Sequence, residues 1–272
     1  MISFSRWRSL DTSNSPKLYP TFWYTLSASL PSSAGQPVPA NPPGQSMTKD
    51  QFYQTNWNWT MQYPGEIFTQ GPANCKMAAF TLDDGPDNLF LPVILDILAQ
   101  YQVKATFFLQ GTCVHANPDM VKQLVNEGHM VANHTYNHLD LTTLPPDEIR
   151  EEIASTETEI QQLTGLRTAL FRPPYGALND TVVQIALSMG YRIILWNVDS
   201  FDWMGLPGPQ IVARVIPNTV SGSIILMHNA CGGSVAAGTG TTQSLPYVIE
   251  VLRAEGYSLA TITALLNIPA YQ

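Results

Sequence analysis

The sequence predicts an α/β protein: a distorted or incomplete (β/α) barrel of about seven parallel strands, preceded by an irregular N-terminal segment. From Lys76 onward, short apolar runs alternate with longer amphipathic runs, which is typical of parallel strands joined by helices. Several of the longer runs end at a glycine, as helices often do. An open doubly wound sheet fits the same pattern, but seven repeats over ~190 residues favour a barrel with one missing or irregular unit.

Each expected strand is a short apolar run bounded by polar or turn-forming residues. The seven strands are expected at 77–82, 105–109, 129–132, 169–171, 191–197, 223–227 and 258–260. Amphipathic runs between them predict helices at 91–101, 118–127, 146–163, 179–189, 208–216 and 243–255. Four of these helices are followed by a glycine, namely Gly128, Gly165, Gly190 and Gly256.

Residues 1–72 differ in composition from the rest of the chain, because they hold many of its prolines together with Ser- and Gly-rich tracts. We therefore divide the chain into an irregular Pro- and Ser-rich segment, 1–72, and one domain, 73–272. The end of the first segment carries the aromatic residues Trp57, Trp59 and Tyr63. They are expected to pack on the domain, with stacking on sugar rings as the alternative.

Charged residues are scarce: they make up 12% of the chain, against about 25% in an average globular protein. The 13 basic and 21 acidic residues give a net charge of −8, so the basic surface expected of a nucleic-acid binder is absent. No apolar run approaches the ~20 residues of a membrane-spanning helix. We expect a monomer that handles neutral polar polymers, with no nucleic-acid partner and no membrane span.

Arg6 and Arg8 precede a weakly apolar stretch, 18–30, which resembles a secretion signal diluted by Pro20. We expect a secreted or cell-wall-associated protein, with a cytoplasmic one as the alternative. The three cysteines lack the C-x-x-C spacing of a zinc ribbon, so each is interpreted as a small buried residue. Cys75 precedes the first strand and Cys231 follows the sixth, at opposite ends of a barrel, so no bond between them is expected.

Polar and ionisable residues collect just after five of the predicted strands. They form Asp-Asp-Gly-Pro-Asp at 83–87, His-Thr-Tyr-Asn-His at 134–138, Arg-Pro-Pro-Tyr-Gly at 172–176, Asp-Ser-Phe-Asp-Trp at 199–203, and His228. The carboxyl ends of barrel strands meet at one rim, where barrels keep their active sites. The sequence therefore predicts an active site at this rim.

His134 and His138 have the spacing of two imidazoles on one face of a helical turn, where both can bind one ion. A carboxylate from 83–84 would complete a two-His, one-Asp set that leaves positions open for water and substrate. The alternatives are ordinary core histidines and an ordinary Asp-Asp-Gly-Pro turn. Asp83 and Asp84 would point to opposite faces of a regular strand, but the turn that follows lets both approach one pocket.

The other strand ends supply groups that suit acid–base chemistry. Arg172, in a stiff proline context, can orient a carboxylate through a bidentate contact. His228 would serve as a general acid if Asp199 held it charged. Trp203 and Leu226 could line a small apolar pocket, with core packing as the alternative.

These segments resemble the sequence blocks of the polysaccharide deacetylases of carbohydrate esterase family 4, which include chitin deacetylases and NodB-type enzymes. Residues 81–87 resemble its T-F-D-D-G-P block, 134–138 its H-[S/T]-x-x-H, 172–176 its R-x-P-Y, 199–203 its D-x-x-D-W and 226–228 its L-x-H. Leu82, where phenylalanine is usual, is the one departure inside a block. The blocks occur in order, whereas 1–70 and the Gly- and Ala-rich stretch 229–242 lie outside the resemblance.

The resemblance implies a barrel with fewer than eight regular units and a divalent metal, usually zinc, with cobalt as another option. The metal ligands it implies are Asp84, His134 and His138. It implies that Asp83 is the general base and that Arg172 orients it.

By the same resemblance, His228 is the general acid, Asp199 tunes it, and the backbone N–H of Tyr175 stabilises an oxyanion. Trp203 and Leu226 are implied to hold the acetyl methyl group. The expected activity is removal of N-acetyl groups from N-acetylglucosamine units of chitin or chitooligosaccharides, with release of acetate. Chitin is preferred because the composition is similar to that of fungal secreted enzymes. The alternatives are a deacetylase of peptidoglycan or acetylated xylan, and a non-catalytic carbohydrate-binding relative.

Overall fold

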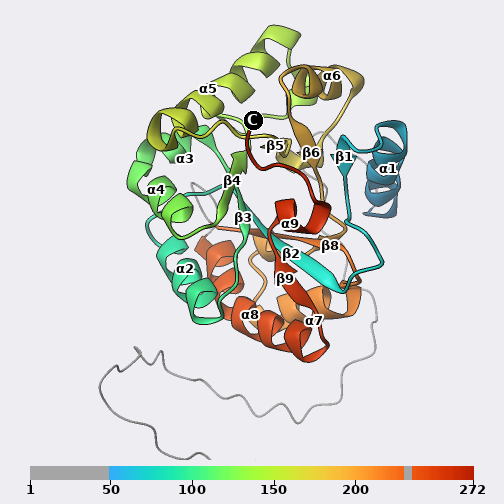
Figure 1. Ribbon diagram of the computed structural model, residues 1–272, viewed down its shortest axis with the longest axis vertical. Coiled ribbons are helices and arrows are strands. Elements are labelled where there is room, and N and C mark those ends of the chain that lie inside the picture. Colours follow the sequence, from blue (N-terminus) through green and yellow to red (C-terminus); the bar gives the residue numbers. More distant parts are fainter. Residues whose placement is uncertain (1–48, 230–234) are drawn as a thin grey trace, which may run out of the picture. The chain divides into compact units, whose positions relative to one another are not determined.

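A curved parallel sheet lies at the centre of the protein, and helices surround it (Figure 1). The computed structural model describes residues 49–229 and 235–272. Within these residues the sheet has nine strands, and every pairing between strands is parallel. The strands are β1 (Ile67–Phe68), β2 (Met77–Asp83), β3 (Thr106–Leu109), β4 (Met130–Asn133), β5 (Leu170–Phe171), β6 (Arg192–Ile194), β7 (Val198–Asp199), β8 (Ser223–His228) and β9 (Ser258–Ala260).

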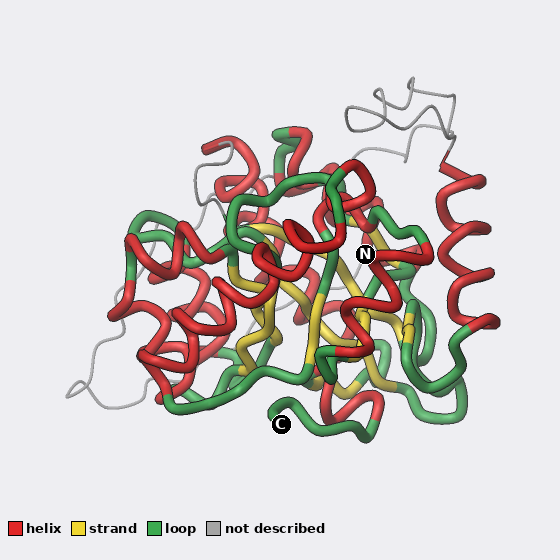
Figure 2. Tube along the Cα trace, turned by 90° about the horizontal axis from the view of Figure 1, so that it is seen from above, coloured by secondary structure: helices red, strands yellow, loops and turns green. Residues whose placement is uncertain are grey.

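The helices lie mainly between successive strands, as the sequence pattern predicts. They are α1 (Lys49–Gln62), α2 (Leu91–Gln100), α3 (Gly111–Ala116), α4 (Pro118–Asn126), α5 (Pro146–Thr164), α6 (Asp180–Ser188), α7 (Gly208–Asn218), α8 (Val235–Ala254) and α9 (Ile262–Leu266). Three short 3-10 helices are η1 (Leu141–Thr143), η2 (Pro174–Gly176) and η3 (Asp202–Met204). In the view of Figure 2 the strands lie inside a layer of helices.

The segment 192–199 closes the sheet on itself. It contains both β6 and β7, yet these two strands lie near opposite ends of the order β1-β6-β5-β4-β3-β2-β8-β7, in which β9 also pairs with β2. Between them, the Leu195 N–H donates to Phe68 O over 2.7 Å, and the Asn197 N–H donates to Ile224 O over 3.3 Å. This segment therefore forms hydrogen bonds with strands near both ends of the strand order, which confirms the predicted distorted barrel.

All seven predicted strands are present, but the sequence did not predict β1, β7, α1, α3 or α9. β1 and α1 lie in the segment 1–72, whose prolines suggested irregular structure. Those prolines are concentrated before residue 49, and only Pro64 falls between residues 49 and 68, so a helix can form there. Trp59 and Tyr63 of this region pack against the core, as predicted, whereas Trp57 is 53% exposed.

Helix α8 begins at Val235, well before the predicted start at residue 243. Its glycines made the sequence there look like a loop. A Cβ added to Gly238 would lie 2.3 Å from the Phe90 ring, and one added to Gly240 would lie 2.3 Å from the Leu206 carbonyl oxygen. The glycines are therefore needed for close packing of the helix.

The two faces of β2 have different surroundings, because alternate side chains of a strand point in opposite directions. Phe80 and Leu82 pack in the core cluster that the strands share with the outer helices. Thr81 and Asp83 point to the other face, where both bond the buried side chain of Arg172. The polar side chains at this end of β2 therefore point into the interior of the barrel.

Three further expectations concern regions away from this rim. No helix in the described ranges has the length and apolar character needed to cross a membrane. The signal-like stretch 18–30 lies outside the described residues, as does Cys231. Cys75 carries a free thiol, so it has no bond to Cys231, as expected, but it is only partly buried, so its interpretation as a buried residue is wrong. Cys113 is buried, as expected, and it is also disulfide-bonded, a pairing that the sequence analysis did not assign.

His129 is a buried histidine at the start of β4. Its Nδ1 accepts a hydrogen bond from the Ala105 N–H over 3.2 Å, so Nε2 carries the ring proton. That Nε2 has no hydrogen-bond partner among the described residues. Burial, together with the charge of Lys104, lowers the pKa of His129 to about 4.

We predict that acidification from about pH 6.5 to about pH 4 destabilises the fold, because the unfolded chain binds a proton that native His129 does not. The contribution of this ring is on the order of 2–3 kcal/mol. Urea unfolding at both pH values will measure it, with His129→Gln as the variant. The variant is expected to lose less stability on acidification than the wild type, and an equal loss would contradict the prediction.

Candidate active site

Strand register brings the polar strand ends into one layer at the rim. Asp83 at the end of β2 is paired with Phe108 of β3 and with His228 of β8. On the other side, the Arg172 N–H donates to Asn133 O over 3.0 Å, which places Arg172 beside the residue that precedes His134. These segments therefore lie together at the rim, as predicted, because the pairing of the strands places their ends side by side.

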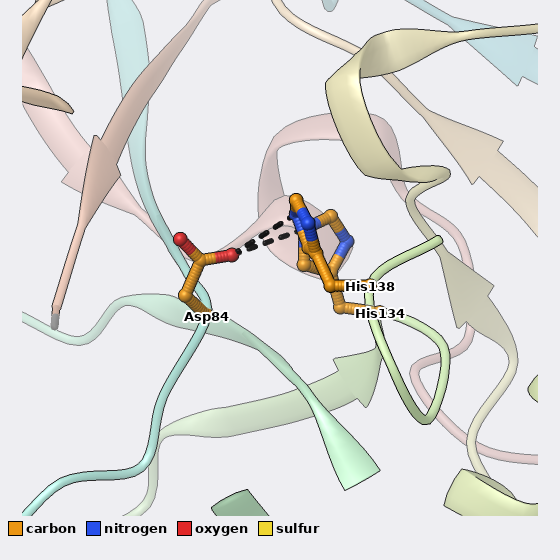
Figure 3. Close-up of side chains that lie close together, drawn as sticks. All are labelled: Asp84, His134 and His138. Carbon is orange, nitrogen blue, oxygen red and sulfur yellow. Dashed lines mark ion pairs between the residues drawn. The ribbon is translucent and has the colours of Figure 1, made fainter. Parts of the chain in front are cut away.

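Asp84, His134 and His138 form a cluster with the geometry of a metal site (Figure 3). Asp84 Oδ1 lies 3.5 Å from His134 Nε2 and 3.3 Å from His138 Nε2. One ligand atom from each residue lies within 4.8 Å of the others. Asp84 Oδ1 is buried and has no hydrogen-bond partner in the described part of the chain. An orphaned carboxylate oxygen between two imidazole nitrogens fits a divalent cation.

The hydrogen bonds and pKa values of the cluster also suit a metal. Burial would raise the pKa of Asp84, but His134, His138 and the charged ring of His228 lower it below its usual range, so this carboxylate is ionised. Burial lowers the pKa of His138 to about 4, so its ring is neutral. The Nδ1 of His134 lies 2.7 Å from the Arg172 carbonyl oxygen. A carbonyl can only accept, so Nδ1 carries a proton, and Nε2, which faces Asp84, is the ring nitrogen left to bind a metal ion.

The backbone of the site departs from regular structure at several positions. Asp84, Thr135, His138, Tyr175 and Phe201 all have φ between 57° and 75°, a region that non-glycine residues rarely adopt. For Asp84 this conformation breaks the strand alternation after Asp83. Both carboxylates can therefore approach one site, as the sequence analysis expects, although they are neighbours in the chain.

Asp83 is held by Arg172, as predicted. The Arg172 Nη1 donates to Asp83 Oδ1 over 2.6 Å, and both side chains are almost fully buried. The other oxygen, Oδ2, lies 3.7 Å from His134 Nε2, on the side of the metal cluster. The guanidinium also stacks on the Phe108 ring at 4.1 Å. Its further acceptors are Thr81 Oγ1, Ile194 O and Leu195 O.

His228 is paired with Asp202, and the assignment of Asp199 as its partner is wrong. His228 Nδ1 lies 2.7 Å from Asp202 Oδ1, and the His228 N–H donates to Asp202 Oδ2 over 2.7 Å. The hydroxyl of Thr241 also donates to this buried carboxylate. Burial would lower the pKa of His228, but Asp202, with help from Asp84 and Asp83, raises it to about 10. His228 is therefore a charged imidazolium.

Asp199 has another role. Its Oδ1 accepts hydrogen bonds from the Phe201 N–H over 2.8 Å and from the Trp203 indole over 3.3 Å. Burial raises the pKa of Asp199 to about 6. The sequence could not separate Asp199 from Asp202, because the left-handed turn at Phe201 decides which carboxylate reaches His228.

The predicted substrate-binding residues lie around this cluster. Trp203 is 39% exposed beside Asp202, whose Oδ1 accepts from the Trp203 N–H over 2.8 Å. The ring of Tyr175 packs edge-on to His138, with centroids 4.8 Å apart. Leu226 is buried and lies two residues before His228 on β8, so both point to one face of the strand. Their contact with a substrate stays a prediction.

We predict that Asp202→Asn lowers the pKa of His228 from about 10, because it removes the negative charge nearest to the imidazole. Asp199→Asn is the matched control, since it makes the same change three residues earlier without breaking the pair. NMR titration of the His228 ring in the metal-free variants will measure both pKa values. An equal shift in both variants would contradict the pairing.

We further predict that His134→Ala and Asp84→Asn prevent metal binding, whereas Asp83→Asn keeps the metal. The reason is that Asp83 is bonded to Arg172, while the other two present free ligand atoms to the cluster. Metal content after zinc loading and dialysis can be measured by mass spectrometry. An Asp83→Asn protein without bound metal would contradict the prediction, because it would show that Asp83 is also needed for metal binding.

Comparison with known proteins identifies the family of this chain. A family model described as polysaccharide deacetylase matches residues 70–194. A peptidoglycan-N-acetylglucosamine deacetylase from Bacillus cereus is 36% identical over 230 residues, which cover 85% of this chain and 82% of that protein.

Solved structures agree in fold as well. The crystal structure of the Bc1960 peptidoglycan N-acetylglucosamine deacetylase matches with a TM-score of 0.76 and 36% identity, over 80% of this chain and 100% of that one. A Bacillus anthracis protein described as a CE4 family pseudoenzyme matches with a TM-score of 0.68 and 35% identity, over 73% of this chain and 68% of that one. This chain therefore belongs to the polysaccharide deacetylase family, carbohydrate esterase family 4.

Proposed function

We propose that this protein removes N-acetyl groups from N-acetylglucosamine units of peptidoglycan, with a divalent metal ion, zinc by preference, bound by Asp84, His134 and His138. The observation that carries the proposal is one cluster in which an ionised carboxylate meets two imidazoles, beside the Asp83–Arg172 pair. A bound ion would supply a Lewis acid for the acetyl carbonyl and a water of lowered pKa.

The protein side chains around the metal ligands divide the proton transfers. Asp83 has one oxygen fixed by Arg172 and the other turned toward the cluster, so it can take the proton of an attacking water. His228 is charged and held by Asp202, so it can protonate the leaving nitrogen. An amide needs this step because an amine anion is too basic to leave. The Tyr175 N–H and the Trp203 and Leu226 side chains are proposed to bind the oxyanion and the acetyl methyl group.

The choice of peptidoglycan rests on the relatives. The B. cereus protein and the Bc1960 structure are both named for peptidoglycan N-acetylglucosamine. The sequence analysis preferred chitin on a compositional analogy, and these relatives favour its alternative. Chitin offers the same acetamido sugar, so it belongs in the test. We also propose that the protein is secreted or wall-associated, because peptidoglycan lies outside the cell membrane.

A non-catalytic role is the competing reading, because the family includes a protein described as a pseudoenzyme. In this chain, however, the residues proposed as metal ligands, base and acid are all present and lie in consistent contacts. Family membership alone does not imply turnover, whereas this arrangement supports it.

Acetate release from peptidoglycan, chitooligosaccharides and acetylated xylan, each with zinc, cobalt or manganese, tests the proposal. We expect release from peptidoglycan, and a loss of about 10²–10⁴-fold in kcat for metal-loaded Asp83→Asn, because general-base catalysis contributes that much. Acetate release from chitooligosaccharides but not from peptidoglycan would change the proposed substrate to chitin. Metal and glycan binding without any acetate release would overturn the proposed activity.

A further inference from the structure

The loop that carries the two metal-ligating histidines, 134–138, is fixed from two sides. Thr135 and His138 both have left-handed backbone conformations, which cost free energy and need support from their surroundings. On one side, the N–H groups of Gly111 and Thr112 at the start of α3 donate to the carbonyl oxygens of Thr135 and Tyr136 over 2.9 and 3.1 Å.

On the other side, Glu152 of helix α5 receives the loop's amide groups. Its Oε2 accepts from the backbone N–H of Tyr136 over 3.1 Å and from that of Asn137 over 2.8 Å. Its Oε1 accepts from the Asn137 side-chain amide over 2.7 Å. The two residues held in this way are two of the three between the histidines, so the contact acts on the span that separates the ligands.

The next residue of the helix secures the start of the same loop. The Asn133 side-chain amide donates to Ile153 O over 2.8 Å, and its oxygen accepts from the Thr135 N–H over 3.0 Å. Helix α5 therefore fixes both the entry of the loop and its middle.

Glu152 is only 7% exposed. Burying a carboxylate is costly unless hydrogen bonds compensate it, and here three donors converge on it. Removing the carboxylate would leave two backbone N–H groups without their acceptor. These two N–H groups could then bond to water only if the loop moved. His134 and His138 would move with the loop.

We infer that Glu152 is a positioning residue of the metal site, which sets the separation and direction of the two imidazoles without touching the ion. This inference rests on the proposed metal-dependent function. Glu152 was not found in the sequence analysis, because it lies inside an amphipathic helix, away from every strand end. Exposed Glu151 beside it looks the same in the sequence.

The test compares Glu152→Ala with Glu151→Ala, which makes the same charge change at the exposed neighbouring position of the helix. Cobalt(II) titration of the metal-free proteins will give the dissociation constant, and the absorption spectrum of bound cobalt will report ligand geometry. We expect Glu152→Ala to bind about tenfold more weakly or worse, as changes to groups that orient metal ligands do, with an altered spectrum. Glu151→Ala should match the wild type in both.

Two further variants separate positioning from folding. Glu152→Gln keeps one acceptor oxygen and should recover part of the affinity. Ile160→Val trims a buried side chain of the same helix and should lower the melting temperature without changing cobalt affinity. If Glu152→Ala does not fold, Glu152→Gln decides the inference: a dissociation constant and spectrum equal to those of the wild type would overturn it.

The same titration of the wild type separates this inference from the proposed function. A wild-type protein that binds no cobalt and no zinc would overturn the proposed metal-dependent activity, and the inference with it. Tight binding by the wild type together with unchanged binding by Glu152→Ala would overturn the inference alone.

Discussion

Buried Arg172 contacts both the Asp83 carboxylate and the Asp84–His134–His138 cluster. Its side chain binds Asp83, and its backbone carbonyl oxygen accepts a hydrogen bond from His134 Nδ1. It also bonds the carbonyl oxygens of Ile194 and Leu195, at the point where the chain crosses from β6 toward β7. A buried charge is costly unless it is well paired, and losing its partner costs about 3–5 kcal/mol. Asp83, His134 and the segment that links β6 to β7 are thus all held by one residue, through its side chain and its backbone carbonyl.

Around Arg172, aspartates that are close in sequence have different properties because they have different contacts. Asp83 meets a guanidinium, whereas Asp84, one residue later, meets two imidazoles. Asp202 pairs with His228, whereas Asp199 accepts from a backbone amide and an indole. In each pair a left-handed residue, Asp84 or Phe201, separates the two carboxylates in space. Unusual backbone geometry is therefore part of how the site assigns its roles.

Much of the fold could be predicted, because buried parallel strands leave uninterrupted apolar runs that are easy to recognise. The cluster of Asp84, His134 and His138 and the pair Asp83–Arg172 were also predictable from strand ends and family blocks. Asp202 was not distinguished from Asp199, since the choice depends on a turn that leaves no pattern in the sequence. α1 was missed because its region was judged by the prolines before it, and the start of α8 because glycines there serve packing. Glu152 was missed because a helix surface shows no difference between a glutamate that faces water and one that faces a loop.

Strand β1 has a consequence for anyone who trims this protein. The match to the family model begins at residue 70, after the end of β1. Strand β1 nevertheless pairs with β6 in the sheet. A shortened chain that starts at that boundary would leave the outer N–H and C=O groups of β6 without partners. Exposed strand edges pair with other chains, so such a fragment would be prone to self-association even with Asp84, His134 and His138 all present.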